Sequence, residues 1–301
     1  MRVRLLGTAA GGGFPQWNCR CANCVAARQN RLTPLAQCSL AFSPSGRNWY
    51  LVNATPDVTQ QFAQWSELHP QSGIRSSPVE GVILTDGELD HVLGLLHLRE
   101  ASRWTLYAAP PVAEMIENDL RLMPALRRYA DVRVQPLVPE TPLYLADGPA
   151  RVEVRLVPTG SHLPRYLSRT APQTPPAVGG LLLTDMTSGR RLAYAPCVGE
   201  LSDALRDHLN GADVILFDGT FWSDDELRRL GAGGQTATAM GHVPVGGPAG
   251  SACWLSNLSA RTKLYVHINN TNPLLDRHSP ERASIRALGL EVATDGWTLT
   301  V

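Results

Sequence analysis

Short apolar or alternating runs recur from one end of the chain to the other, with helix signals between many of them. Runs of this length, bounded by Gly, Pro and small polar residues, are typical of β-strands. They occupy residues 3–6, 49–52, 79–84, 104–108, 152–157, 181–183, 214–217, 264–268 and 297–301. Because strands and helices are mixed in both halves, the pattern favours a layered α/β sandwich with mixed sheets. No shift in composition marks a boundary, so we expect one domain over residues 1–301.

Three segments in the first three quarters of the chain carry helix signals. Apolar residues at helical spacing favour helices within residues 91–103 and 112–120. Ser223 and Glu226 have the spacing of a capping box, which predicts a helix that begins there and runs towards Leu230.

The last part of the chain carries two local signals. Ser279 as N-cap, Pro280 at the first helical position and Gly289 as a stop predict a helix between them. Asp295-Gly296 lies between two short apolar runs, and this dipeptide favours a type I′ turn. We therefore expect the chain to end in a β-hairpin.

Charge and hydropathy argue against several classes of function. Lys plus Arg and Asp plus Glu number 27 each, without a basic run, so the sequence has no electrostatic footprint for nucleic acid. No stretch approaches the ~18 apolar residues of a membrane span, and the amino terminus lacks the apolar core of a signal peptide. We therefore expect a cytoplasmic protein with reduced thiols and without a nucleic-acid partner. A homodimer is compatible with the sequence.

Three cysteines, Cys19, Cys21 and Cys24, are crowded into one short segment. In a reducing compartment such a cluster indicates metal ligation rather than a disulfide. Three thiolates at this spacing can occupy three corners of a tetrahedron around zinc, and a site closed by protein ligands is structural. The alternative interpretation is three free thiols beneath a loop. His267 and His278 are the candidates for a fourth ligand, and the spacing does not choose between them.

An apolar strand ends and a helix begins within residues 85–91, which read TDGELDH. Carboxylates and an imidazole gathered at one such corner suit a divalent metal. The plainer interpretation is that Asp90 caps the helix and Asp86 forms an Asx turn.

Further polar candidates follow later strands. Asp218 ends the apolar run 214–217, at a position where layered α/β folds place functional carboxylates. His162 and His242 lie in loops, where a solvated or hydrogen-bonded histidine is the common alternative to a metal ligand. Residues 7–13 are glycine-rich but lack the Gly-Lys-Ser/Thr ending of a P-loop. The sequence also lacks the Gly-x-Ser-x-Gly elbow of a serine hydrolase.

These pieces resemble the metallo-β-lactamase superfamily, whose members carry a His-x-His-x-Asp-His motif after a strand. The matching register here is Asp86-x-Glu88-x-Asp90-His91, so only the final Asp-His pair is retained. The resemblance implies an α/β fold of the αββα sandwich type with two mixed sheets. Because the first two imidazoles are missing, it argues against a dinuclear hydrolase that cleaves a phosphodiester or ester.

Several longer sequence strings resemble one family within this superfamily. They are GGGFPQWNC at 11–19, YAP at 194–196, DGT at 218–220, MGH at 240–242 and HINNTNP at 267–273. With the cysteine loop, they look like the bacterial family of pyrroloquinoline quinone (PQQ) biosynthesis protein B over nearly the whole chain. The resemblance implies a substrate derived from a Glu–Tyr unit of a ribosomal precursor peptide.

Two functions from different classes are implied by this resemblance. One is an iron-dependent oxygenase that hydroxylates the tyrosine ring of the Glu–Tyr unit. The other is a non-catalytic carrier that moves PQQ or its precursor towards the periplasm. A mixed carboxylate and imidazole site with open positions favours the oxygenase, because such ligands are typical of iron sites that activate O₂.

The resemblance also implies a structural zinc, Zn(2+), at Cys19, Cys21 and Cys24. Related phosphodiesterases with this loop use a histidine at the position of His267 for the catalytic metal, and a histidine three residues later for the zinc. Asn270 occupies that later position here. Because an amide is a poor zinc ligand, we expect His267 to be the fourth ligand of the zinc.

For the active site, the resemblance implies an open mononuclear centre that prefers Fe(2+) to zinc. Asp90, His91 and His242 are the expected ligands, with Asp86 or Asp218 nearby.

Two loops are the expected walls of the substrate pocket. They are the proline-rich loop at 164–180 and the glycine-rich stretch at 231–247. Arg165 and Arg169 on the first loop are candidates for binding the acidic groups of a Glu–Tyr unit, although solvated surface arginines are the plainer interpretation.

Overall fold

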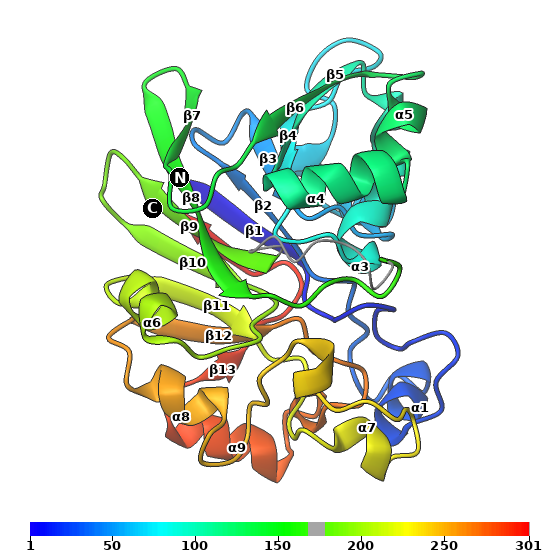
Figure 1. The fold of residues 1–301 in the computed structure, drawn as a ribbon, viewed down its shortest axis with the longest axis vertical. Helices are drawn as coiled ribbons and strands as arrows, with labels where there is room; N and C mark the ends of the chain where they lie inside the picture. Colours follow the sequence, from blue (N-terminus) through cyan, green and yellow to red (C-terminus); the bar gives the residue numbers. More distant parts are fainter. Residues whose placement is uncertain (168–177, 301) are drawn as a thin grey trace.

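Two seven-stranded sheets pack face to face in the computed structural model, which describes residues 1–167 and 178–300 (Figure 1). The first sheet has the order β14-β1-β2-β3-β4-β5-β6, and the second has the order β13-β12-β11-β10-β9-β8-β7. The strands of the first are β1 (Arg2–Gly7), β2 (Ser39–Ser43), β3 (Trp49–Val52), β4 (Val79–Ile83), β5 (Arg103–Ala108), β6 (Asp131–Pro136) and β14 (Thr298–Thr300). Those of the second are β7 (Leu143–Asp147), β8 (Ala150–Gly160), β9 (Val178–Asp185), β10 (Arg191–Ala195), β11 (Val214–Asp218), β12 (Thr262–Val266) and β13 (Glu291–Val292).

Both sheets are mixed, in the same way. In the first sheet, pairing is antiparallel from β14 to β3 and parallel from β3 to β6. In the second, it is antiparallel from β7 to β10 and parallel from β10 to β13. The prediction of two mixed sheets is therefore confirmed.

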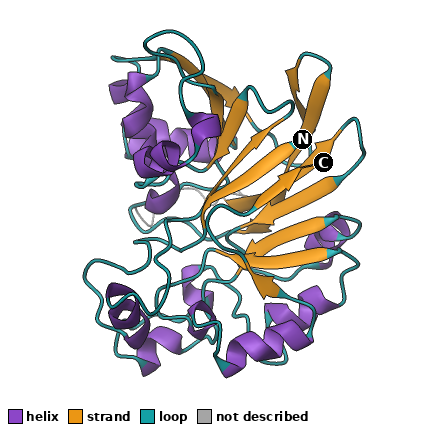
Figure 2. Cartoon of the chain, turned by 180° about the vertical axis from the view of Figure 1, so that it is seen from behind, coloured by secondary structure: helices purple, strands orange, loops and turns teal. Residues whose placement is uncertain are grey.

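Helices cover the outer faces of the two sheets, which gives an αββα sandwich (Figure 2). The α-helices are α1 (Ala22–Arg28), α2 (Val58–Gln64), α3 (Leu89–Val92), α4 (Pro110–Glu114), α5 (Leu122–Leu126), α6 (Asp203–Leu209), α7 (Glu226–Arg229), α8 (Ser251–Ser256) and α9 (Pro280–Ala287). Short 3₁₀ helices lie at Ser66–Leu68, Leu93–Glu100, Thr238–Met240 and Pro273–Leu275, and a π-helical turn at Met115–Asp119. In the described part of the chain, no helix has the length and apolar character needed to cross a membrane.

The burial of the strands follows from this layering. Every residue of β2, β3 and β11 is buried, because each of these strands is covered on both faces. One core cluster joins apolar side chains of the two inner faces, including Leu40 and Leu51 of the first sheet and Leu183 and Leu216 of the second. A second cluster lies between the second sheet and helices α6, α8 and α9.

The predicted hairpin at the end of the chain is wrong. β13 pairs with β12 in the second sheet, whereas β14 pairs with β1 in the first. The Asp295-Gly296 segment therefore crosses from one sheet to the other. The Asp295 carboxylate holds this crossing, because it accepts hydrogen bonds from the hydroxyl of Thr8 and the backbone N–H of Ala36, both at 2.7 Å.

The helix predictions had mixed outcomes. Helix α9 begins and is capped as predicted, since the Ser279 hydroxyl accepts a hydrogen bond from the N–H of Arg282 at 3.0 Å. The predicted helix 91–103 is mostly 3₁₀ and ends before β5 begins. Ser223 does not form a capping box, because the N-cap of α7 is Asp225, and Glu226 instead accepts a hydrogen bond from the N–H of Trp222.

Candidate active site and cysteine site

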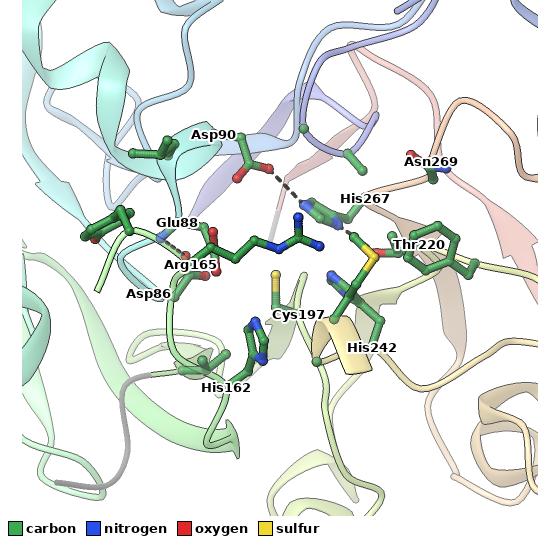
Figure 3. Close-up of a pocket in the computed structure, with 18 residues that line it drawn as sticks. Asp86, Glu88, Asp90, His162, Arg165, Cys197, Thr220, His242, His267 and Asn269 are labelled. Carbon is green, nitrogen blue, oxygen red and sulfur yellow. Dashed lines mark hydrogen bonds and ion pairs between the residues drawn. The ribbon is translucent and has the colours of Figure 1, made fainter. Parts of the chain in front are cut away.

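A pocket with a volume of about 310 Å³ lies where loops from both sheets meet. The first sheet contributes the corner between β4 and α3, and the second contributes the loops after β8, β10, β11 and β12. Figure 3 shows the labelled polar side chains of these loops turned towards one space. The residues that line it are Ala10, Gly11, Asp86, Glu88, Leu89, Asp90, His162, Arg165, Tyr166, Val178, Cys197, Thr220, Phe221, Met240, Gly241, His242, His267 and Asn269.

The Asp86–His91 pair forms the floor of the pocket on the side of the first sheet. Both side chains are buried, and the two Asp86 oxygens each lie 2.8 Å from Nδ1 of His91. Asp86 also accepts hydrogen bonds from the Thr85 hydroxyl at 2.8 Å and from the N–H of Glu88 at 2.9 Å, the latter forming an Asx turn. With Nδ1 engaged, Nε2 of His91 is left buried without a hydrogen-bond partner among the described residues. A buried imidazole nitrogen of this kind is suited to metal ligation.

A second Asp–His pair lies opposite, at the ends of strands of the second sheet. Asp218 ends β11, and its Oδ2 lies 2.7 Å from Nδ1 of His242. The same carboxylate accepts hydrogen bonds from the Thr220 hydroxyl at 2.6 Å and the N–H of Val198 at 2.8 Å. Carboxylates that hold the Nδ1–H of histidines in this way fix the ring orientation and the tautomer.

His267 lies between the two pairs, after β12. Its ring centroid is 5.3 Å from that of His91 and 5.5 Å from that of His242. Its Nδ1 lies 2.8 Å from the Thr220 hydroxyl, and its Nε2 lies 3.3 Å from the carboxylate of Asp90 (Figure 3). Asp90 lies within α3, whose N-cap is Glu88, so Asp90 is not the cap that the plainer interpretation of the sequence required.

Charge in this pocket is dominated by carboxylates. Burial opposes a positive charge on His91, but Asp86 and Asp90 outweigh it and raise the pKa of His91 to about 9. Burial and the same two carboxylates raise the pKa of Glu88 to about 7. For Asp90, burial acts in the opposite direction, yet His91 and His267 hold its pKa below the ordinary value. The carboxylates therefore stabilise positive charge in a buried space, and this favours the binding of a cation.

Cys197 is a further pocket residue, and no sequence motif marks it as one. It follows β10, is buried, and has its Sγ within 4.8 Å of a ring nitrogen of His91 and of His267. Burial, with Asp86 and Asp218 nearby, raises the pKa of its thiol well above the ordinary value. The only local signal in the sequence is its position directly after the YAP string.

The three clustered cysteines come together as predicted, outside this pocket. The Sγ atoms of Cys19, Cys21 and Cys24 all lie within 4.8 Å of one another at the start of α1. The side-chain amide of Asn270 faces them, with Nδ2 at 3.0 Å from Cys19 Sγ, 3.6 Å from Cys21 Sγ and 3.4 Å from Cys24 Sγ. Three thiols at these separations fit a tetrahedral zinc ion.

The structure does not bring His267 or His278 to the cysteines. His267 faces the pocket, as described above, and His278 is exposed, with its Nε2 3.1 Å from Nε of Arg277. His267 has a left-handed backbone conformation with φ of +58°, and its side chain and that of Asn270 contact different sites. The expectation of His267 as fourth ligand of the zinc therefore does not agree with the geometry.

The two predicted loops contribute to the pocket in part. Arg165 and Tyr166 of the first loop line it, and the Tyr166 hydroxyl donates a hydrogen bond to the backbone oxygen of Gly87 at 2.7 Å. Arg169 lies outside the described residues. From the glycine-rich stretch, Met240, Gly241 and His242 reach the pocket.

Comparison with known proteins agrees with this architecture. The beta-lactamase superfamily domain matches residues 48–268. Coenzyme PQQ synthesis protein B of Azoarcus sp. (strain BH72) is 42% identical over 305 residues, covering 100% of both chains. The protein of the same name from Klebsiella pneumoniae subsp. pneumoniae is 38% identical, covering 100% of this chain and 98% of the relative.

A solved structure shows the same fold in detail. It is the crystal structure of Zn(2+)-bound PqqB from Methylobacterium extorquens, with a TM-score of 0.91 and 38% identity over 100% of both chains. Sequence identity and fold therefore agree along the full length of the chain, and we conclude that it belongs to the coenzyme PQQ synthesis protein B family of the β-lactamase superfamily.

Proposed function

We propose that this protein is an iron-dependent hydroxylase of PQQ biosynthesis that acts in the cytoplasm on the tyrosine ring of a Glu–Tyr unit. The names of its relatives support a role in the biosynthesis of this cofactor. One observation carries the choice of chemistry: a carboxylate, Asp90, and two imidazoles, His91 and His267, lie together at an open pocket. Two histidines and one carboxylate with open positions are the ligand set typical of non-haem Fe(II) oxygenases.

The residues present fit a metal at this position. Nε2 of His91 is buried and has no hydrogen-bond partner in the described part of the chain, and the adjacent Asp90 carboxylate lies 3.9 Å from it. We propose Asp90, His91 and His267 as ligands, and we retain His242 as the fourth candidate. The sequence predicted His242 as the third ligand beside Asp90 and His91. We propose His267 in its place, because Nε2 of His267 faces Asp90 directly. Iron bound there would supply the activation of O₂.

The neighbouring carboxylates position these ligands. Asp86 accepts the Nδ1–H of His91 and keeps Nε2 free for the metal, and Asp218 does the same for His242. Asp86 occupies the first histidine position of the superfamily motif, so a position used for metal binding elsewhere serves here to orient an imidazole. This replacement disfavours the dinuclear hydrolase.

Arg165 gives the pocket a cation for an acidic substrate. Its guanidinium extends into the space between Asp90, His162 and His242 in Figure 3. A guanidinium can bind a carboxylate in bidentate fashion. We propose that Arg165 binds an acidic group of the Glu–Tyr unit and so places the aromatic ring over the metal site. A cavity of about 310 Å³ is suited to a dipeptide-sized ligand, which argues against the full-length precursor as the preferred substrate.

We further propose that the zinc expected in this family is bound by Cys19, Cys21 and Cys24, as a structural ion. The three Sγ atoms already lie together, and the loop that carries them contacts the segment after β12 through Asn270. The Zn(2+)-bound relative supports zinc as the metal of the family.

The test is an assay of a Glu–Tyr dipeptide with the iron-loaded protein, O₂ and a two-electron organic reductant. The reaction consumes O₂ and two electrons, placing one oxygen atom on the ring and releasing the other as water. We expect a hydroxylated dipeptide, faster turnover than with the full-length precursor, and no product with zinc as sole metal. Binding without turnover would support the carrier, and hydrolysis would support the ancestral chemistry.

Three variants make this assay specific. His91→Ala should abolish turnover and weaken iron binding while leaving zinc at the cysteines in place. His97→Ala, an exposed histidine on the following 3₁₀ helix, is the control and should behave as the parent protein. Arg165→Ala should raise KM for the dipeptide at least about tenfold, the loss expected for a charge-assisted contact. Unchanged kinetics in Arg165→Ala would exclude the proposed contact of Arg165 with the substrate and would leave the rest of the proposal intact.

A further inference from the structure

Cys197 has surroundings that distinguish it from the other buried cysteines. It lies after Pro196 at the end of β10, on the floor of the pocket, and its side chain points towards the centre of the labelled residues in Figure 3. Its Sγ, a nitrogen of His91 and a nitrogen of His267 form one group in which all ligand atoms lie within 4.8 Å of one another. Cys38 is also buried, but its Sγ lies 3.2 Å from the hydroxyl of Tyr194.

An independent observation points to a ligand at this group. The side chain of His91 is 1% exposed, and its Nε2 has no hydrogen-bond partner among the described residues. A buried polar atom without a partner is destabilising, so its retention beside a thiol and a second imidazole requires an explanation. A cation bound by all three side chains provides one.

We propose that Cys197 is a thiolate ligand of the active-site metal, together with His91 and His267. The proposal rests on the metal centre of the proposed function and adds a sulfur to its ligands. As the sulfur–metal bond forms, the thiol proton leaves to solvent, because only the thiolate is a good ligand. A sulfur ligand changes which metals the site prefers, because thiolates select softer ions than carboxylates do.

Cobalt(II) is the probe that makes the sulfur visible. The protein is first prepared with zinc in the cysteine loop, checked by metal analysis, and Co(II) is then added to the open site. We expect a near-ultraviolet sulfur-to-cobalt charge-transfer band at one equivalent of Co(II). Cys197→Ser should lose this band and bind Co(II) at least about tenfold more weakly. Cys38→Ser, the matched control, should keep both the band and the affinity.

Two further variants keep the test decisive. Cys197→Asp offers an oxygen ligand, so it should bind Co(II) but lack the sulfur band. Recovery of binding by a different ligand atom is not expected if Cys197 has only a structural role. His91→Ala should lose Co(II) from the open site altogether. Two outcomes would overturn the proposal. One is a charge-transfer band that persists in Cys197→Ser. The other is a parent protein that shows no such band although it binds Co(II) at the open site, as judged by the loss of Co(II) in His91→Ala. None of these readouts requires hydroxylation, so failure of the proposed reaction would be seen separately.

Discussion

The two histidines at either side of the pocket are held in the same way. Asp86 lies 2.8 Å from Nδ1 of His91, and Asp218 lies 2.7 Å from Nδ1 of His242. Both carboxylates are buried, so each hydrogen bond is shielded from competing water. The direction in which each Nε2 points is therefore fixed before any ligand arrives.

Thr220 connects the Asp218–His242 pair to His267 through one hydroxyl. Its Oγ1 lies 2.6 Å from Asp218, 2.8 Å from Nδ1 of His267 and 3.1 Å from Nδ1 of His242. Donation of the single hydroxyl hydrogen to Asp218 leaves Oγ1 to accept from the Nδ1–H of His267. The hydroxyl thus keeps Nε2 of His267 turned towards Asp90.

We predict that Thr220→Val lowers the affinity of the open site for Fe(II) or Co(II) about 10- to 100-fold, the usual loss when a group that orients a metal-binding histidine is removed. Thr220→Ser retains the hydroxyl and should bind the metal as the parent protein does. Calorimetric titration of zinc-loaded protein measures both. Equal affinities in all three proteins would show that the hydroxyl does not orient the imidazole.

Asp295 gives a pH dependence of folding that is separate from the pocket. Burial raises its pKa to about 6, against the hydrogen bonds from Thr8 and Ala36 that favour the charged form. Between pH 4 and pH 6, this carboxyl holds more protons in the folded than in the unfolded state. Its contribution to stability therefore falls as pH rises through this range and is constant above it.

We predict that the free energy of unfolding of the parent protein, relative to Asp295→Asn, falls by about 1 kcal/mol between pH 4 and pH 6.5, a figure reduced for the partial exposure of the carboxyl. Urea denaturation of both proteins across this range measures the difference. A difference that rises with pH would mean that the folded state favours the carboxylate.

At the residue scale, the sequence predicted which side chains come together better than where they point. Asp90 and His91 were found from their place after a strand, and the cysteine cluster from its spacing. The assignment of His267 to the zinc failed because the left-handed conformation of one residue decides which site its side chain faces, and spacing does not report φ. Cys197 and Thr220 were missed as site residues because a single thiol or hydroxyl carries no pattern.

At the scale of elements, the crossing between β13 and β14 is closely packed against Trp65. Gly296 has φ of +83°, and a Cβ there would lie 2.4 Å from the ring of Trp65. Only glycine satisfies both conditions, because a side chain would be strained by the backbone conformation and would also displace the indole.

We predict that Gly296→Ala lowers the free energy of unfolding by about 2 kcal/mol or more, since strain and a steric clash add. Gly289→Ala is the matched control. It has a similar φ of +73°, but no atom of the described residues lies within 4 Å of the added Cβ, so the substitution should cost only about 1 kcal/mol. Chemical denaturation measures both, and equal losses would mean that Trp65 moves without penalty.

The same crossing explains why the hairpin prediction failed. A type I′ signal is local, but the two flanking strands pair with β12 and with β1 rather than with each other. The helix signals at Ser279 and Pro280 succeeded because caps satisfy backbone groups within the same turn. Local chemistry is therefore reliable for helix ends and weak for strand partners.

At the scale of the whole molecule, two candidate metal sites are built on separate scaffolds. The cysteine site joins the loop before α1 to Asn270, whereas the pocket joins the corner of α3 to loops of the second sheet. A chelator should therefore remove metal from the open pocket first, with loss of activity and little loss of stability.

We predict that Cys21→Ser, in contrast, loses the zinc and lowers Tm by about 4 °C or more, because a bound structural metal contributes directly to folding. Cys253→Ser is the control, since this thiol is exposed and lies outside the cluster. Metal analysis and calorimetry provide the readouts. Stoichiometric zinc and unchanged Tm in Cys21→Ser would rule out a structural zinc at the cysteines.

The α/β sandwich itself was predictable from the sequence, because the apolar runs at both ends and in the middle all became strands. Runs such as 49–52 and 214–217 are buried throughout, which is the pattern of strands covered on both faces. The membership of each sheet was not predictable from the runs alone, because it depends on pairing between distant segments.

Because the pocket residues come from both sheets, the order in which the chain is synthesised determines when the pocket can be complete. Asp86 and His91 lie close together in the sequence and can pair as soon as β4 and α3 form, whereas His267 follows β12, which is synthesised much later. Strand β1 likewise gains its neighbour β14 only after the whole second sheet has been synthesised. The pocket is therefore complete only after both sheets have been synthesised, and the proposed metal would gain its full set of ligands only at that stage.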